Sequence, residues 1–295
     1  MVNKLTDKDD MTPRRSFIFA PALKPDMFYK ALKCGADIVC VELEDGVAPK
    51  DKDLARGNAI EMFSGLNSNE FVDVEKVLRI NTIRSQVGLD DVRAILEAKI
   101  PPPVVMLPKV MTPDEVIWLD ELFSERGHDT RFHIIIETNE GLENAYEIAK
   151  ASPRIEALFF GGFDMAAELR CEMAWEPLLY ARSRVVHAAA GAGIDAIDVP
   201  FLDLKDLEGM RREAELSRNL GYCGKGAIHP SQIASLNAVF TPSAEKINHA
   251  RQIVTAFEAA DTGLLVIEGK LIEKPVIREM KRLLAIADRM TDKKS

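Results

Sequence analysis

Short apolar segments recur along the whole chain, and helical patterns separate them. Eight short segments are predicted to be strands, and several of them are continuously apolar, as strands covered on both faces should be. They lie at residues 16–20, 37–43, 76–80, 104–108, 132–137, 157–161, 195–199 and 224–228. Helices are predicted between them at 25–32, 89–98, 112–123, 142–149, 177–190 and 204–220. Eight alternating units predict an α/β fold, a (β/α)₈ TIM barrel. A doubly wound sheet is the less favoured alternative, because no G-x-G-x-x-G follows the first strand.

The chain continues well beyond the eighth predicted strand. Residues 231–240 suit the eighth barrel helix, and further helices are predicted at 244–260 and 275–290. We therefore predict a catalytic barrel at 14–240 and a C-terminal helical lid or oligomerisation arm at 241–290, with a simple packing appendage as the alternative. The charged ends of the chain, including Arg14 and Arg15, are predicted to be frayed tails.

Charge and cysteine content exclude several classes of protein. With 38 basic and 47 acidic residues the net charge is −9, so neither nucleic acid nor an anionic membrane is an expected partner. The 4 cysteines form no C-x-x-C pair, which indicates a reduced, cytoplasmic protein without a zinc site. No apolar run reaches the roughly 18 residues of a membrane span, and no signal peptide is expected.

Two acids follow consecutive predicted strands, where a barrel places its active site. Glu137 ends the fifth strand and Asp164 follows the sixth, so their carboxylates can reach one point. Two carboxylates without a competing cysteine or histidine suit Mg²⁺, which completes its octahedron with water or substrate. The alternative is that both acids cap helices or pair with bases at the rim.

Arg79 ends the third predicted strand between two apolar residues. A guanidinium in this position is unlikely to stay unpaired. Its fork suits a substrate carboxylate or an enolate oxygen. A buried salt bridge to Glu44 or Asp45, which follow the second strand, is the alternative.

Other polar residues give weaker signals. Lys24 and Lys30 flank the start of the first predicted helix, an arrangement that can bind a phosphate but is also common on surfaces. His229 precedes a proline and is predicted to cap the last barrel helix rather than act as a base.

An ordered set of motifs spans roughly residues 14–290. They are RRSFIFAPALKPDMFYKAL, GADIVCVELEDGVAPKDKDLAR, LRIN, VVMLPKV, IIIETNEGL, FFGGFDMAAEL, YARSRVVHAA, DLEGMRREAELSRNLGYCGKGAIHPSQI, FTPSAEKINHAR and EGKLIEKP. In this order they resemble the citrate lyase β-subunit family of the HpcH/HpaI aldolase superfamily, which includes malyl-CoA and citramalyl-CoA lyases. Each motif alone is weak, but the ordered set is specific.

The resemblance implies a barrel with a C-terminal lid, assembled into homotrimers or hexamers. It also implies that Glu137 and Asp164 bind Mg²⁺, for which Mn²⁺ can substitute, and that Arg79 binds the substrate. The matching positions for coenzyme A contacts are Phe19, Lys24 and Lys30. The matching acids that orient metal-bound water are Glu44 and Asp45.

One departure from the family lies near the end of the chain. Lyases of the family carry an aspartate that reaches a neighbouring subunit's site as an acid or base, and Glu273 stands there in this chain, one methylene longer. The resemblance implies a carbon–carbon lyase that converts a short β-hydroxyacyl-CoA into a 2-oxo acid or glyoxylate and an acyl-CoA. The alternatives are a citrate lyase β-subunit acting on a carrier-bound citryl thioester, a coenzyme A-free pyruvate aldolase, and a catalytically silent binding subunit.

Overall fold

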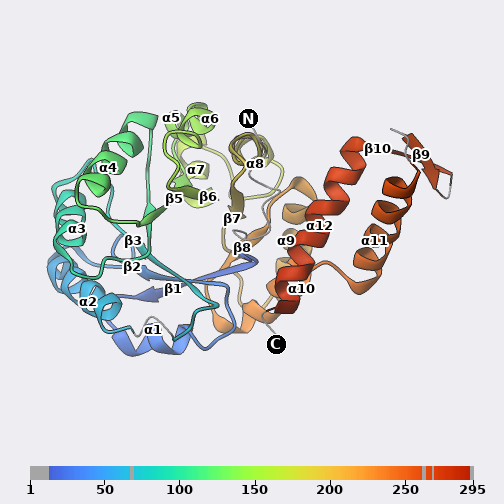
Figure 1. The fold of residues 1–295 in the computed structure, drawn as a ribbon. Helices are drawn as coiled ribbons and strands as arrows, with labels where there is room; N and C mark the ends of the chain where they lie inside the picture. The colour runs from blue at the N-terminus through green and yellow to red at the C-terminus, as the bar shows by residue number, and fades with distance from the viewer. Residues whose placement is uncertain (1–12, 67–69, 261–263, 268, 293–295) are drawn as a thin grey trace. The chain divides into compact units, whose positions relative to one another are not determined.

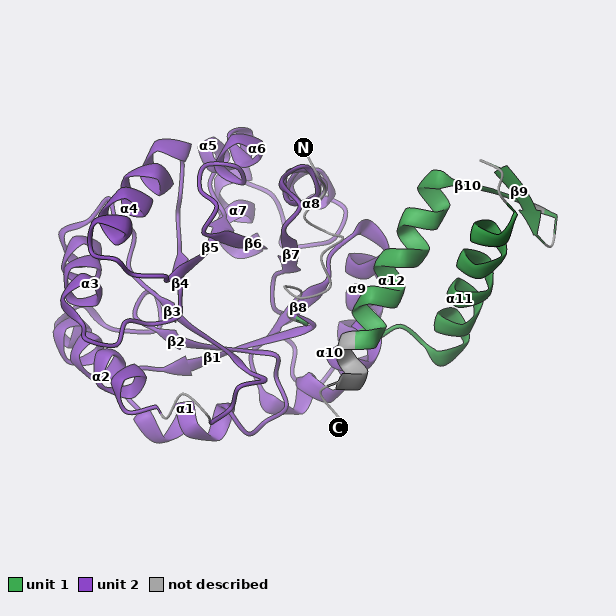
Figure 2. Cartoon of the chain, viewed as in Figure 1, with its two compact units in different colours: residues 1–13, 241–295 green, residues 14–240 purple. Residues whose placement is uncertain are grey.

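The computed structural model describes residues 13–66, 70–260, 264–267 and 269–292. Within this part of the chain, residues 14–240 form one compact unit, and the chain from Thr241 onward belongs to another (Figure 2).

The first unit is a closed barrel of eight parallel strands that pair in sequence order, with β1 completing the ring against β8 (Figure 1). The strands are β1 (Ser16–Pro21), β2 (Ile38–Glu42), β3 (Glu75–Arg79), β4 (Val104–Leu107), β5 (Arg131–Ile136), β6 (Ile155–Phe160), β7 (Asp195–Asp198) and β8 (Gly224–Ala227). Each overlaps the strand expected from the apolar pattern, so the predicted (β/α)₈ barrel is confirmed.

Helices surround the barrel. They are α1 (Pro25–Ala31), α2 (Lys52–Ser64), α3 (Gln86–Glu97), α4 (Pro113–Glu125), α5 (Asn139–Glu143), α6 (Ala145–Ile148), α7 (Gly162–Leu169), α8 (Leu179–Ala192), α9 (Leu207–Leu220) and α10 (Ile233–Phe240), with 3₁₀ turns η2 (Pro49–Asp51) and η3 (Pro230–Gln232). His229 accepts a hydrogen bond from the Ser231 amide and so caps η3, the turn that leads into α10, rather than the helix α10 itself.

The apolar pattern missed two helices and merged two others. Half of the buried residues of α2 are alanines, which give little contrast with the polar face. The short helix α7 starts directly after β6, where the pattern predicted only a strand end. The structure also divides the single helix predicted at 142–149 into α5 and α6.

Alternate strand residues face two different cores. One set, which includes Cys40, Val77 and Ile135, fills the inside of the barrel, and the other packs between the strands and the helices. Because side chains alternate along a strand, Glu42, Arg79 and Glu137 share the inward phase of the first set. The same alternation that fills the barrel with apolar side chains therefore directs three charged groups into its mouth.

The prediction that Arg14 and Arg15 belong to a frayed tail is wrong. The Arg14 side chain is 7% exposed, and its guanidinium donates hydrogen bonds to three carboxylates that lie at the amino ends of β3, β6 and β7. Arg15 pairs with Asp37. A run of charged residues at a chain end is typical of a disordered tail, but here two of them neutralise acids at the amino ends of the barrel strands.

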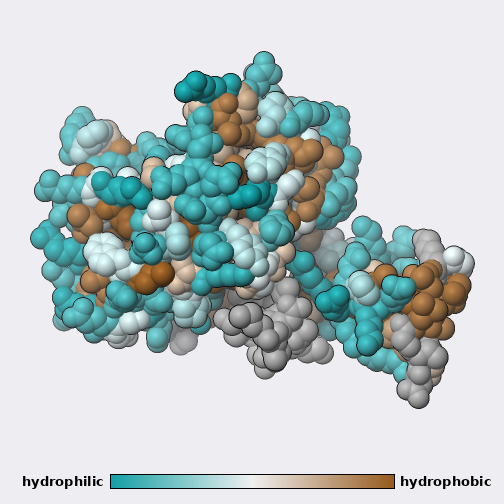
Figure 3. All heavy atoms as spheres, turned by 90° about the horizontal axis from the view of Figure 1, so that it is seen from above, coloured by the Kyte–Doolittle hydropathy of each residue, from teal (hydrophilic) through white to brown (hydrophobic). Residues whose placement is uncertain are grey.

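The second unit consists of two helices and a hairpin. Helix α11 (Ala244–Ala259) and helix α12 (Lys274–Asp292) are connected through the antiparallel strands β9 (Leu264–Ile267) and β10 (Lys270–Glu273). Ile253, Ile272 and Ile277 form a small core. Leucine and valine side chains of the hairpin are exposed, and hydrophobic surface gathers over it (Figure 3). None of the helices in the described residues is long and apolar enough to cross a membrane.

Candidate active site

The loop after β2 is fixed by two polar side chains. The Lys52 ammonium donates to the carbonyls of Leu43 and Glu44, at 2.7 Å in both cases, and to the side chain of Asn81 at 2.6 Å. The Asn81 amide in turn donates to the Leu43 carbonyl at 3.0 Å. These bonds hold the Glu44 backbone in place at the barrel mouth.

Arg79, the last residue of β3, is held by the two glutamates of the neighbouring strand and loop. Its Nε lies 2.5 Å from Glu42 Oε2, and its Nη1 lies 3.3 Å from Glu44 Oε2. Its guanidinium carbon also stands 4.5 Å above the centre of the Phe19 ring. Burial raises the pKa of Glu42 and of Glu44, although Arg79 opposes the shift in both. The guanidinium is therefore locked in orientation while one edge of it faces the barrel mouth.

Lys109 joins the two acidic sides of the site. It adopts a left-handed conformation with φ of 54°, which is uncommon for a residue with a Cβ. In this conformation its backbone N–H donates to Glu137 Oε1 at 2.9 Å, while its ammonium pairs with Glu44 and lies 3.6 Å from Asp45 Oδ2. One strained residue thus orients Glu137 and neutralises Glu44.

Glu137 and Asp164 face each other at the carboxyl ends of β5 and β6. Glu137 is 3% exposed and forms no ion pair with a base among the described residues. Burial, together with repulsion from Glu44 and Asp164, raises the pKa of Glu137 to about 8. Gly161 lies directly against it, since a Cβ at that position would collide with the Glu137 side chain. The absence of a side chain at position 161 therefore leaves room for the Glu137 carboxylate.

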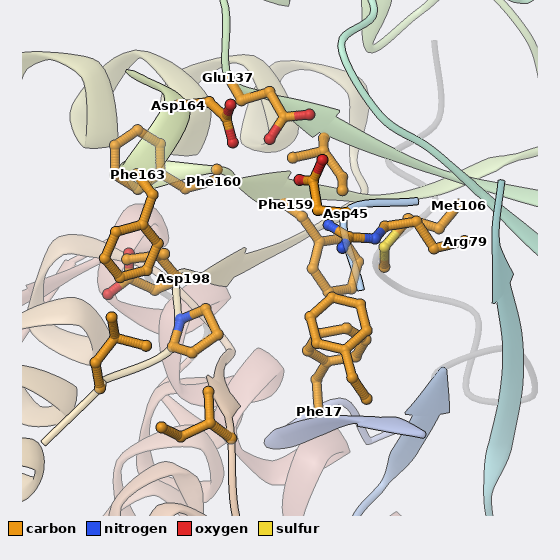
Figure 4. Close-up of a pocket in the computed structure, with 17 residues that line it drawn as sticks. Phe17, Asp45, Arg79, Met106, Glu137, Phe159, Phe160, Phe163, Asp164 and Asp198 are labelled. Atoms are coloured by element: carbon orange, nitrogen blue, oxygen red, sulfur yellow. The ribbon is translucent and has the colours of Figure 1, made fainter. Parts of the chain in front are cut away.

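A cavity of about 260 Å³ lies at this end of the barrel, with the two acids on one wall (Figure 4). Of the residues expected at the site, Phe19, Asp45, Arg79, Glu137 and Asp164 line it. Glu44 lies just behind, paired with Arg79 and Lys109.

The remaining expected residues do not line the cavity. Lys24 and Lys30 are exposed at the start and in the last turn of α1. Glu273 belongs to the second unit and is exposed there.

Sequence reasoning missed the roles of Glu42 and Lys109. The signal for Glu42 was available, because it shares the inward phase of Ile38 and Cys40 along β2 and lies in register with Arg79 of β3. No pattern in the sequence signals the left-handed backbone of Lys109 or its bond to Glu137.

The donor set fits a hard divalent cation. Two carboxylates stand together, and burial with repulsion from Glu44 and Asp164 raises the pKa of Glu137 although Lys109 opposes the shift. A second group, Glu75, His133 and Glu156, has candidate ligand atoms within 4.8 Å of one another. It lies at the opposite end of the barrel, and Arg14 already donates to both of its carboxylates. Glu137 and Asp164 are therefore the better candidates.

The fold and the site together define the class: a (β/α)₈ barrel with a pair of carboxylates and an arginine at the carboxyl ends of its strands. The chain belongs to the HpcH/HpaI aldolase/citrate lyase family, whose model matches residues 15–230. The expected family and the expected enzyme class, a carbon–carbon lyase, are thereby confirmed.

Several relatives match almost the whole chain. It is 32% identical to the citrate lyase subunit beta of Leuconostoc mesenteroides subsp. cremoris, over 93% of each chain. It is 33% identical to an L-malyl-CoA/beta-methylmalyl-CoA lyase of Cereibacter sphaeroides, over 94% of this chain and 95% of the relative.

The fold is similar to that of the protein CitE from Mycobacterium tuberculosis, solved in complex with magnesium, acetoacetate and coenzyme A. The two superpose with a TM-score of 0.76 and 30% identity, over 92% of this chain and 97% of that one. Magnesium, the cofactor expected from the sequence, is thus present in a homologous structure.

Proposed function

We propose that this chain is a magnesium-dependent carbon–carbon lyase that cleaves a short β-hydroxyacyl-CoA, such as malyl-CoA or citramalyl-CoA. The products are an acyl-CoA and a 2-oxo acid or glyoxylate. The observation that carries this proposal is a pair of carboxylates that form no ion pair with a base among the described residues. They belong to Glu137 and Asp164, which share a small cavity with Arg79.

The reaction is a redistribution of one bond and one proton. The β-hydroxyl loses its proton, the bond between the α and β carbons breaks, and its electron pair forms the thioester enolate. The hydroxyl-bearing carbon becomes the carbonyl of the oxo acid, and the enolate takes a proton at its α carbon. Mg²⁺ held by Glu137 and Asp164 would supply Lewis acidity at that carbonyl, worth several kcal/mol in the transition state. Arg79 would stabilise the enolate oxygen or bind the substrate carboxylate. Its orientation is fixed in advance by Glu42 and Glu44.

The coenzyme must lie mostly outside the cavity. A volume of about 260 Å³ is below the roughly 300–1,000 Å³ of typical ligand pockets, so it suits only the reacting end of an acyl-CoA. Lys24 and Lys30 are exposed, and we assign them to the coenzyme phosphates. Replacing each with alanine should raise the KM for an acyl-CoA more than it lowers kcat, because remote contacts give uniform binding. Lys33→Ala, an exposed lysine just beyond α1, is the matched control.

The segment 241–290 is proposed to act as a lid on a neighbouring subunit, with Glu273 moving the proton there. The homotrimer or hexamer that this requires stays a prediction, as does the cytoplasmic location. Mixing Arg79→Ala with Glu273→Ala after dissociation should restore activity, since some sites then hold both residues. Mixing Arg79→Ala with Glu137→Ala should not, because those two residues belong to one barrel. Equal activity of the two mixtures, with subunit exchange shown by mass spectrometry, would rule out a lid that acts on the neighbouring subunit.

The overall proposal is tested with the purified chain, Mg²⁺ and a panel of acyl-CoA thioesters. Cleavage that requires Mg²⁺ and is lost in Asp164→Asn supports it. A second candidate is a citrate lyase β-subunit, favoured by the relative of that name, and it predicts turnover only when the citryl group is carried by an acyl carrier protein. Turnover of the free hydroxy acid would indicate a coenzyme A-free aldolase, and no turnover of any substrate would indicate a silent subunit.

A further inference from the structure

The cavity that holds the two metal-binding candidates has charged side chains on some walls and aromatic rings on others. Below the acids its floor is formed by Phe17 and Phe159, and Arg79 and Phe163 stand on opposite sides (Figure 4). Phe163 directly precedes Asp164 in the first turn of α7, so the aromatic wall and the acid are placed by the same turn. A substrate bound at the acids must therefore turn one side toward the guanidinium and another toward aromatic rings.

The charges that line the cavity leave nothing for a second carboxylate. Arg79 is the single cation among the described residues that line it, and Glu42 and Glu44 already bind that guanidinium. The other charged lining residues are acids. One of them, Asp198, is compensated from behind by the buried Lys225 ammonium at 2.7 Å and by Arg182 Nε at 3.0 Å. Asp45, Glu137 and Asp164 keep the cavity negative.

The loop after β7 adds apolar side chains to the lining of the cavity. Val199 and Leu202 line the cavity, and Asp198, the residue before Val199 in the chain, is neutralised by Lys225. Leu202 is 53% exposed, so this part of the wall forms the mouth.

From this arrangement, and resting on the proposed function, we propose that the site selects a 2-oxo acid with one carboxylate and a small apolar substituent, of which pyruvate is the simplest. Its carboxylate and keto oxygens satisfy the cation and Arg79, and its methyl group lies against the aromatic wall. Oxaloacetate would place a second carboxylate among phenylalanines without a partner, which is unfavourable because a buried charge needs a counter-charge. Glyoxylate would leave the apolar wall uncovered. One methyl group in such a pocket is worth on the order of tenfold or more in discrimination.

The test uses the full chain with Mg²⁺. Condensation of acetyl-CoA with pyruvate or oxaloacetate is followed by mass spectrometry of the hydroxyacyl-CoA product. We expect a kcat/KM for pyruvate at least about 100-fold above that for oxaloacetate. Binding of pyruvate, oxaloacetate and glyoxylate to the Mg²⁺-loaded protein is measured separately by calorimetry, without coenzyme A. Glyoxylate is compared by Kd alone, because it is the more reactive carbonyl, and its Kd should be about tenfold weaker than that of pyruvate.

A charge added to the apolar wall should reverse the selection. Leu202→Arg supplies a partner for the second carboxylate. It should raise the kcat/KM and the binding affinity for oxaloacetate, each relative to pyruvate, at least tenfold. Leu204→Arg is the matched control, since Leu204 is a similarly exposed leucine of the same loop that does not line the cavity. Leu202→Met keeps the wall apolar and should keep the wild-type order.

The outcomes separate this inference from the proposed function. If oxaloacetate binds and reacts as well as pyruvate, or if Leu202→Arg leaves the ratio unchanged, the selectivity is overturned while the lyase proposal stands. If no oxo acid condenses with acetyl-CoA but the binding order and its reversal hold, the lyase proposal fails and the selectivity stands.

Discussion

The two ends of the barrel each carry a buried polar cluster, and the clusters differ in how their charge is compensated. At the amino ends of the strands, Arg14 donates hydrogen bonds of 2.6–2.9 Å to three carboxylates, those of Glu75, Glu156 and Asp195. Burial alone would raise the pKa of Glu75, but His133 and Arg14 hold it below its ordinary value. The three carboxylates of this cluster are therefore paired within the folded barrel.

The cluster at the carboxyl ends lacks such compensation. The cations Arg79 and Lys109 both lie toward Glu42 and Glu44, which leaves Glu137 with a pKa of about 8. The pKa values of Glu75 and Glu137, two largely buried glutamates, shift in opposite directions, because cations face Glu75 whereas acids face Glu137. The 4.8 Å grouping of Glu75, His133 and Glu156 does not reveal that difference, whereas the direction of the pKa shift does.

The strongest test of this comparison exchanges one glutamate at each end. Glu137→Gln should lower kcat with Mg²⁺ by at least about 10³-fold, because it removes a ligand of an ion worth several kcal/mol. In EDTA its free energy of unfolding should not fall, because the substitution relieves repulsion. Glu75→Gln should show the reverse: reduced stability in urea and nearly normal kcat. Loss of stability in both variants would mean that both clusters are structural.

Removing the Arg14 guanidinium at the amino ends of the strands should reduce stability without reducing activity. Arg14→Met leaves three acids without their guanidinium and should lower the free energy of unfolding by about 3–5 kcal/mol. The kcat of the folded protein should stay within about twofold, since the active site is at the other end. Arg131→Met is the control: Arg131 is half exposed, its single ion pair to Glu156 spans 3.5 Å, and its loss should cost less than about 1 kcal/mol. A comparable loss in both variants would contradict the central role of Arg14.

At the carboxyl end, Arg79→Lys should lower kcat/KM by about 100-fold. A single ammonium cannot hold Glu42 and Glu44 and still present a charge to the enolate. Steady-state kinetics with an acyl-CoA substrate measures the effect. Arg56→Lys, which alters an arginine bound to Asp91 on the helical layer, serves as the control. A rise in KM with unchanged kcat would argue that Arg79 only binds the ground state.

Glu42 should act through Arg79 and therefore have a smaller effect. Glu42→Gln keeps the shape but weakens the 2.5 Å bond to Arg79, and kcat should fall about tenfold. Glu42→Asp, which keeps the charge, should recover part of that loss. If the aspartate variant is no better than the glutamine variant, the charge of Glu42 is not what positions the guanidinium.

The smallest effect concerns acid stability. Because the folded-state pKa of Glu75 lies below its unfolded value of about 4.3, its contribution is present above that pH and is lost as the pH falls. In Glu75→Gln the decline in unfolding free energy below about pH 4 should be shallower by up to about 1.4 kcal/mol per pH unit. Urea titrations at about pH 2 to 5 compare the unfolding free energy of this variant with that of the wild type. If unfolding free energy falls with pH equally steeply in the variant and the wild type, Glu75 does not contribute to the loss of stability in acid.

The sequence by itself predicted the barrel, because eight short, largely apolar segments alternate with helical patterns and no dinucleotide-binding glycine motif follows the first of them. It also located Glu137, Asp164 and Arg79, since residues at the carboxyl ends of strands meet at one end of any barrel. The inward phase of Glu42 was present in the strand pattern as well, although it was not used.

Only the tertiary structure decided which charges neutralise which. Arg14 looks like part of a charged tail in sequence, but it contacts acids as far as 181 positions away in the chain. Lys109 bonds to Glu137 through a left-handed backbone that no local pattern signals, and Gly161 makes room for that carboxylate. Electrostatic compensation depends on distances across the barrel, and local sequence does not encode those distances.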